Sequence, residues 1–248
     1  MDKILISFLM CGHYLQWQTL PEIGAEIPNH SQPKIGHKTE VTAFYISLSA
    51  IESPPTSWCK MREIQIRPAC IEDCSALARI VIDATQHAFE GKVPDDCLNS
   101  LTPEESARNW ARNFEPGESL DQGVYLFVAE VDQKEVIGLA MAGATRKHHV
   151  SAPDILEQFP HELFTIQIDP TWQGKGVGRR LISQVADSLL LEGATRLLVK
   201  MHLDNPNQGF YERLGATRLG SQPHDWDGYV SEEILFGWHD IRKLSMIV

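Results

Sequence analysis

Residues 173–180 read Gln-Gly-Lys-Gly-Val-Gly-Arg-Arg, and no other part of the sequence constrains the fold as strongly. An apolar, strand-like run over 163–169 precedes this segment, and a helical pattern over about 178–192 follows it. Glycines without a Cβ let the backbone turn tightly and present several N–H groups in one direction. The positive end of the helix dipole adds to this arrangement, so we expect the segment to bind a pyrophosphate.

Three classes of loop compete for this pattern. A Walker loop needs Ser or Thr after its Gly-Lys pair, but Gly176 follows Lys175. A dinucleotide fingerprint needs G-x-G-x-x-G in the first strand–helix–strand unit of the fold. Here the third glycine comes one residue early and the segment lies late in the chain. The pattern that remains is Gln-x-x-Gly-x-Gly.

The other periodic segments predict an α/β domain over residues 61–248. We expect strands over 62–67, 125–131, 136–145, 163–169, 196–203, 217–220 and 232–238, and helices over 72–89, 102–114, 178–192 and from Asn205-Pro206 to Gly215. A loop is expected over 146–160. This order predicts a sheet with helices on both faces that is parallel only around the strand–helix–strand unit.

Four segments resemble motifs of the GNAT family of N-acetyltransferases. They are the strand exit and glycine loop over 166–178, Phe-Tyr-Glu-Arg-Leu-Gly-Ala over 210–216, Phe-Gly-Trp-His-Asp-Ile over 236–241, and Ile-Arg-Pro-Ala over 66–69. The resemblance covers nearly all of residues 62–245. It implies a mixed, largely antiparallel sheet with a central parallel strand pair and helices on both faces. It also implies direct attack of an amine on the thioester of acetyl-CoA.

The resemblance also implies roles for particular residues. Tyr211 matches the tyrosine that protonates the leaving thiolate, and Glu162 matches a glutamate that acts as general base through water, with His161 as the competing base. In the family a bulge in the fourth strand frees a backbone N–H for the oxyanion. The residues expected to contact the cofactor are Ile166, Ile168, Gln173, Gly174, Lys175, Gly176, Val177, Gly178, Arg179, Asn205 and Asn207.

The acceptor is not named by the sequence. We expect a primary amine of a small molecule, and the segments 90–101 and 146–160 to set specificity. A protein N-terminus or lysine is the second alternative, and it would need an open, shallow groove. A non-catalytic acyl-CoA sensor is the third, although a sensor would need neither Tyr211 nor Glu162.

Composition excludes some functions. The 22 basic and 33 acidic residues give a formal charge of −11, which disfavours nucleic-acid binding and mildly favours a cationic substrate. The five cysteines form no C-x-x-C pair, and no metal-ligand spacing is present. We expect a cytoplasmic protein without a membrane span, and a homodimer is left open.

Residues 1–60 form a separate segment. They lack a sustained period and contain proline-rich loop signals, so we expect a poorly ordered extension. Met61 stands immediately before the first expected strand, so translation starting there is the other interpretation.

Overall fold

The computed structural model describes residues 63–100, 102–132, 135–147, 150–226 and 228–246. The expected extension over residues 1–60 and the expected start at Met61 lie outside these residues. In the described part of the chain, no helix combines the length and the apolar character that crossing a membrane requires.

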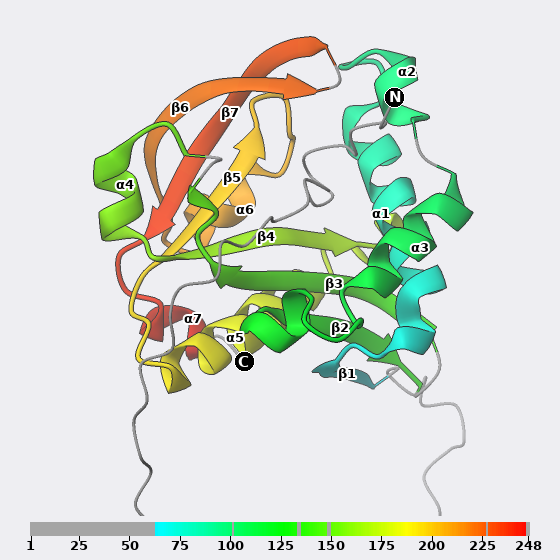
Figure 1. Ribbon diagram of the computed structural model, residues 1–248, viewed down its shortest axis with the longest axis horizontal. Helices are drawn as coiled ribbons and strands as arrows, with labels where there is room; N and C mark the ends of the chain where they lie inside the picture. The colour runs from blue at the N-terminus through cyan, green and yellow to red at the C-terminus, as the bar shows by residue number, and fades with distance from the viewer. Residues whose placement is uncertain (1–62, 101, 133–134, 148–149, 227, 247–248) are drawn as a thin grey trace, which may run out of the picture. The chain divides into compact units, whose positions relative to one another are not determined.

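The described residues form a seven-stranded sheet in the order β1-β2-β3-β4-β5-β7-β6 (Figure 1). The strands are β1 (Ile64–Pro68), β2 (Tyr125–Val131), β3 (Glu135–Ala144), β4 (His161–Ile168), β5 (Leu197–His202), β6 (Thr217–Trp226) and β7 (Tyr229–Trp238). The α-helices are α1 (Cys74–Phe89), α2 (Asp95–Leu98), α3 (Pro103–Arg112), α4 (Pro153–Gln158), α5 (Val177–Leu191), α6 (Gln208–Arg213) and α7 (Arg242–Ser245). All neighbouring strands in this sheet are antiparallel except β4 and β5. The expected mixed sheet with a central parallel pair is therefore confirmed.

Helices cover both faces of the sheet, as expected (Figure 1). On one face, Leu181 of α5 and Leu244 of α7 share a core with Phe236 of β7. On the other face, Ile80 of α1 and Trp110 of α3 pack in a second core against β2 and β3. The helical spacing of apolar residues in α1 and α5 thus reflects one buried stripe on each helix.

The start of α3 follows the capping pattern in the sequence. The Glu105 backbone N–H donates to Thr102 Oγ1 at 3.2 Å, and the Thr102 N–H donates to the Glu105 carboxylate at 3.2 Å. Pro103 stands in the first turn, where its missing N–H costs no intrahelical bond. The predicted capping box is confirmed.

The last hairpin is longer than predicted. The apolar runs indicated strands over 217–220 and 232–238, but β6 extends to Trp226 and β7 begins at Tyr229. Residues 221–225 carry no strand-like apolar pattern and include Pro223, which cannot donate to a strand ladder. This proline is tolerated here because β6 lies at the edge of the described sheet. The expected loop over 146–160 also contains the short helix α4, with Pro153 in its first turn.

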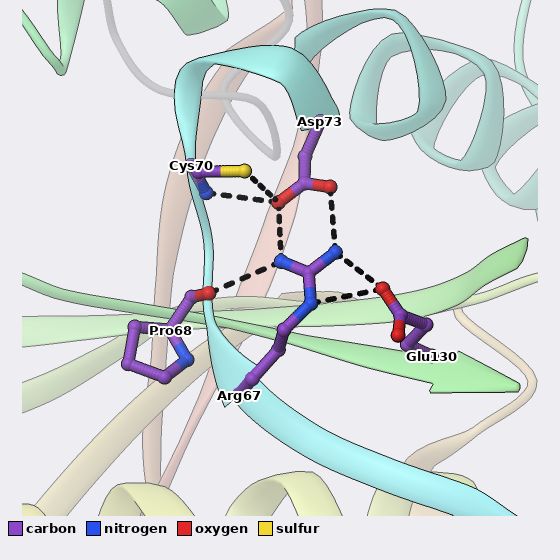
Figure 2. Close-up of polar contacts among 5 residues, drawn as sticks. All are labelled: Arg67, Pro68, Cys70, Asp73 and Glu130. Carbon is purple, nitrogen blue, oxygen red and sulfur yellow. Dashed lines mark hydrogen bonds and ion pairs between the residues drawn. The ribbon is translucent and has the colours of Figure 1, made fainter. Parts of the chain in front are cut away.

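Arg67 ties three elements together at the beginning of the domain (Figure 2). Its guanidinium donates to both carboxylate oxygens of Asp73 at 2.7 and 2.9 Å, and twice to Glu130 Oε2 at 2.9 and 2.6 Å. Burial alone would raise the pKa of Asp73, but the hydrogen bonds from Arg67 outweigh it and hold that pKa below its usual value. Since Asp73 immediately precedes α1 and Glu130 lies on β2, one side chain of β1 holds both in place.

A glycine on β7 lets the segment before β4 approach the sheet closely. A Cβ at Gly237 would lie 2.5 Å from the Phe159 ring. Thr145 also holds this segment, since its N–H donates to the Pro160 carbonyl at 2.9 Å and its Oγ1 donates to the Phe159 carbonyl at 2.6 Å. The start of β4, including Glu162, is thereby fixed.

Candidate active site

β4 and β5 run side by side briefly and then diverge (Figure 1). Their parallel ladder ends at the Leu163–Val199 pair. Directly after it, β4 bulges, because Phe164 is an extra residue relative to β3. The bulge expected in the fourth strand is thus present, and β4 leaves β5 where it occurs.

The glycine-rich segment lies at the end of the diverging β4. Gly174 and Gly176 have φ values of 72° and 82°, in the left-handed region that favours glycine. Gly176 is the N-cap of α5, so the free N–H groups of the first helical turn begin at Val177. A Cβ added to either glycine would meet no other atom within 4 Å. The free N–H groups of the first turn of α5 therefore follow directly on an uncrowded glycine loop, and such a helix N-terminus suits an anion.

Asp169 fixes the position of this loop. It accepts hydrogen bonds from the Thr171 backbone at 3.0 Å and the Thr171 hydroxyl at 2.7 Å, and it pairs with Arg79 of α1 at 2.7 Å. Burial would raise the pKa of Asp169, but these hydrogen bonds prevail and lower it. The carboxylate is therefore ionised at neutral pH and anchors the loop to α1.

A cleft of about 500 Å³ follows the gap between β4 and β5 from the glycine loop to α6 and α1. The charged side chains that line it are Arg179, Lys200 and Arg213, all of them cationic. This contrasts with the whole chain, whose formal charge is −11. The cleft suits an anionic ligand.

The structure gathers most of the residues predicted from the sequence around this cleft. The lining includes Ile166, Ile168, Gln173, Gly174, Gly176, Val177, Gly178, Arg179, Asn205, Asn207 and Tyr211. Lys175 is not among the lining residues, and its Nζ lies 4.8 Å from the centroid of the Trp172 ring. Glu162 is not among them either.

Tyr211 lies on α6 with 7% of its surface exposed. Its ring stacks near Phe236 and lies 6.0 Å from Trp238, centroid to centroid. The indole of Trp238 donates to the Leu214 carbonyl at 3.0 Å, which fixes the end of α6 on β7. Burial raises the pKa of Tyr211, so its hydroxyl keeps its proton at neutral pH.

Glu162 lies behind the cleft between two cations. Arg146 Nη2 is 2.6 Å and Lys200 Nζ 3.4 Å from its Oε1. Burial alone would raise the pKa of Glu162, but the attraction of the two cations prevails and lowers it. Burial lowers the pKa of Lys200, and Glu162 opposes part of that effect. Glu162 is therefore an ionised carboxylate. Of its two cationic partners, Lys200 lines the cleft and Arg146 does not.

The connection from β5 to α6 differs from the expectation. The sequence predicted a helix capped by Asn205 with Pro206 in its first position, but α6 begins at Gln208. The Asn205 side chain instead accepts a hydrogen bond from the Asn207 N–H at 2.9 Å, which closes a turn before the helix. Both asparagines still line the cleft.

Several lining residues escaped the sequence analysis, notably Thr85, Thr165, Lys200 and Arg213. Lys200 carried a usable signal, because it is a lone charge in the otherwise apolar strand over 197–201. The threonines carried none. Among the described residues, no group of three His, Cys, Asp or Glu side chains is placed to hold a metal ion.

Comparison with known proteins identifies the fold and its family. Residues 90–216 match the model of the acetyltransferase (GNAT) family, about half of the chain. The chain belongs to this family. An uncharacterized N-acetyltransferase, YuaI of Bacillus subtilis, is 26% identical over 185 residues, which cover 75% of this chain and 98% of that protein.

Solved GNAT structures share the fold. The putative acetyltransferase yncA from Salmonella typhimurium, solved with its cofactor acetyl-CoA, superposes with a TM-score of 0.50 at 20% identity, over 71% of this chain and 92% of that one. The PaiA N-acetyltransferase from Thermoplasma acidophilum, in complex with coenzyme A, gives a TM-score of 0.53 at 15% identity, over 71% and 98%. The divergence of β4 from β5 thus belongs to a fold that this family uses for acetyl transfer.

Proposed function

We propose that this GNAT protein transfers the acetyl group of acetyl-CoA to a primary amine of a small molecule. The observation that carries the proposal is the continuous cleft between the diverging β4 and β5. Both the glycine loop at the N-terminus of α5 and Tyr211 of α6 line it.

The cleft residues fit coenzyme A in their charge and chemistry. The glycine loop with the free N–H groups of the first turn of α5, together with the Arg179 guanidinium, suits the pyrophosphate. The backbone groups of Ile166 and Ile168, on the part of β4 beyond its ladder with β5, would bond the pantetheine amides. Asn205 and Asn207 would add side-chain contacts where β5 ends.

The thioester supplies an activated acetyl group, and the chain's own residues supply the proton transfers. The amine nitrogen bonds to the thioester carbon while the carbon–sulfur bond breaks. Tyr211, kept protonated by its burial, gives its proton to the leaving thiolate and recovers one from solvent. The backbone beyond the Phe164 bulge would donate to the carbonyl oxygen as it gains charge.

Glu162 remains our proposed general base. It is ionised at neutral pH, which a base requires, and the proton of the amine would reach it through water beside Lys200. The same cations that keep it ionised make it a weak base. This proposal therefore depends on Lys200 as much as on Glu162.

The wall of the cleft supports a small-molecule acceptor over a protein. Ala84, Thr85, Ala88 and Phe89 of α1 enclose one side. A protein N-terminus or lysine would need an open groove there. We place the reaction in the cytoplasm, where the thiols of Cys70, Cys74 and Cys97, which form no disulfide among the described residues, would stay reduced.

Thermal unfolding with candidate ligands tests the proposal. A ligand that binds the folded state raises the melting temperature. We expect acetyl-CoA to raise it markedly and NADH and ATP to raise it little, because the loop satisfies neither a dinucleotide nor a Walker pattern. Equal stabilisation by NADH would contradict the assignment of the loop.

A further inference from the structure

Two threonine hydroxyls on the α1 side of the cleft have no hydrogen-bond partner among the described residues. They belong to Thr85 of α1 and Thr165 of β4, whose oxygens are buried and whose residues are 3% and 5% exposed. Both residues line the cleft. A buried hydroxyl without a partner is destabilising, so such a pair beside a cleft is expected to bond to a ligand.

These hydroxyls lie on the side of the sheet away from α5. Thr165 pairs with Met141, which packs in the core beneath α1, whereas Ile166 and Ile168 pack in the core beneath α5. The residues assigned to coenzyme A therefore leave Thr85 and Thr165 unused. Their side of the cleft is where an acceptor would approach the thioester.

The charged group that lines this side of the cleft is an ammonium. Lys200 lines the cleft with its side chain 6% exposed, whereas the Arg146 guanidinium, 4.6 Å from the centroid of the Phe164 ring, does not line it. The balancing carboxylates do not line the cleft. Glu162 is 1% exposed between the two cations, and Glu233 is bonded toward β6 by Gln222 at 2.8 Å.

His224 Nδ1 lies 3.3 Å from the other oxygen of Glu233, so that carboxylate is engaged on both oxygens. This side of the cleft is thus lined by one ammonium and by two threonines whose hydroxyls lack a described partner, while neither carboxylate lines it. An acceptor with cationic groups alone would find no lining carboxylate to pair with here, while a carboxylate would gain a charge-assisted hydrogen bond from Lys200.

We propose that the acceptor is an amino acid, a small molecule that carries a carboxylate beside its primary amine. Lys200, Thr85 and Thr165 are specificity-determining residues that bind this carboxylate, and Phe89 and Phe164 contact the apolar remainder. The inference rests on the proposed acetyl transfer and deepens it. It separates this protein from enzymes that acetylate polyamines, aminoglycosides or protein lysines. It also differs from the expectation of a cationic substrate, which the acidic composition mildly favoured.

Matched acceptors test the inference on the unmodified protein. L-phenylalanine and L-leucine are each compared with the corresponding amino-acid amide and decarboxylated amine, by the initial rate of acetyl-CoA-dependent thiol release. We expect kcat/KM to be at least ~10-fold higher for the acids, as for one charge-assisted hydrogen bond. The amides are less basic and hold more neutral amine, so a preference for the acids cannot come from amine basicity.

Variants separate a binding role from a structural one. Thr165→Val keeps the shape and removes the hydroxyl, so we expect the KM of the acid to rise about 5-fold or more while the protein alone melts at the same temperature or higher. Lys200→Met should bring the acid-to-amide ratio close to one. Lys243→Met on the exposed surface of α7 is the matched control and should keep the ratio of the unmodified protein.

The outcomes distinguish this inference from the function on which it rests. Thiol release with equal kcat/KM for acids and amides, or with polyamines only, overturns the carboxylate inference and leaves acetyl transfer intact. An absence of both acetyl-CoA stabilisation and thiol release with any amine overturns the proposed function, and this inference with it. A lower melting temperature with unchanged KM for Thr165→Val would make the threonine structural and contradict its assigned role.

Discussion

The Glu162 carboxylate lies 3.4 Å from the Lys200 ammonium, with the two side chains 1% and 6% exposed. Arg146 contacts the same carboxylate oxygen at 2.6 Å. Two cations therefore share one buried anion, and Lys200 is the member that lines the cleft. A substitution at Glu162 is therefore expected to change both the stability of the fold and the environment of Lys200 in the cleft.

Replacing Glu162 by Gln keeps the size of the side chain and removes its charge. We expect the free energy of unfolding to fall by about 3–5 kcal/mol at neutral pH, the usual cost of breaking a buried ion pair. The folded-state pKa of Glu162 lies below the reference value of 4.5, so its stabilisation is present above that pH and is lost as pH falls through the folded-state pKa. Urea unfolding across this range measures the difference between the two proteins.

The difference in unfolding free energy between the unmodified protein and Glu162→Gln should become smaller in acid. Glu157→Gln, at an exposed position of α4, is the matched control and should change stability little at any pH. A difference for Glu162→Gln that stays constant down to acid unfolding would contradict the ionised state assigned to this carboxylate.

The glycine loop can be tested with an isosteric pair. Gly176 has a φ of 82°, which Asn tolerates better than most residues, and a Cβ there meets nothing within 4 Å. Gly176→Asn and Gly176→Asp should therefore fold with similar stability. We expect Asp to abolish most of the rise in melting temperature that acetyl-CoA produces, because its carboxylate would repel the pyrophosphate, while Asn keeps much of it. Equal losses for the two variants would make backbone strain the cause.

Arg67→Lys tests the anchor in Figure 2. Lysine keeps the charge but cannot reproduce the paired hydrogen bonds that the guanidinium makes with Asp73 and Glu130. We expect the free energy of unfolding to fall by ~1.5–3 kcal/mol, measured by chemical denaturation. The acetyl-CoA affinity of the folded protein should stay unchanged, because none of these residues lines the cleft. A weaker affinity without a loss of stability would contradict a purely structural role.

Much of the fold could be predicted because its signals are local. The capping box at Thr102 and the glycine loop at 173–178 depend on residues within a few positions of each other. Local signals failed to predict the structure where a neighbouring element determines it. The predicted strand ended at residue 220, whereas β6 continues through Pro223, because its position at the sheet edge makes a proline acceptable there.

The residues of the candidate active site also divide into those that local motifs predicted and those that only the fold brings together. The motifs marked Tyr211 and the loop, since these residues stand in recognisable patterns. The partners of Glu162 come from positions 146 and 200, which are brought to it only by the pairing of β4 with β3 on one side and with β5 on the other. The sequence therefore could not show that Glu162 is buried between two cations, as it is in the structure.

A chain that begins at Met61 should behave like the full chain. The motifs and the described elements all lie after this residue, and residues 1–60 lack periodicity. We expect an unchanged melting temperature and an unchanged Kd for acetyl-CoA, measured by calorimetry. A large loss in either quantity would show that the first 60 residues stabilise the domain.

The rate of thiol release from acetyl-CoA with an amine acceptor, compared between the unmodified protein and Tyr211→Phe, tests the proposed reaction most directly. The Phe ring still packs beside Phe236 and Trp238. We therefore expect the Tyr211→Phe variant to have an unchanged KM for acetyl-CoA and a kcat lower by ~10²-fold or more. Tyr125→Phe, which loses a hydroxyl bonded to Glu192 outside the cleft, should keep its kcat. An undiminished kcat for Tyr211→Phe would contradict its role as the acid. No thiol release by the unmodified protein with any amine would contradict acetyl transfer itself.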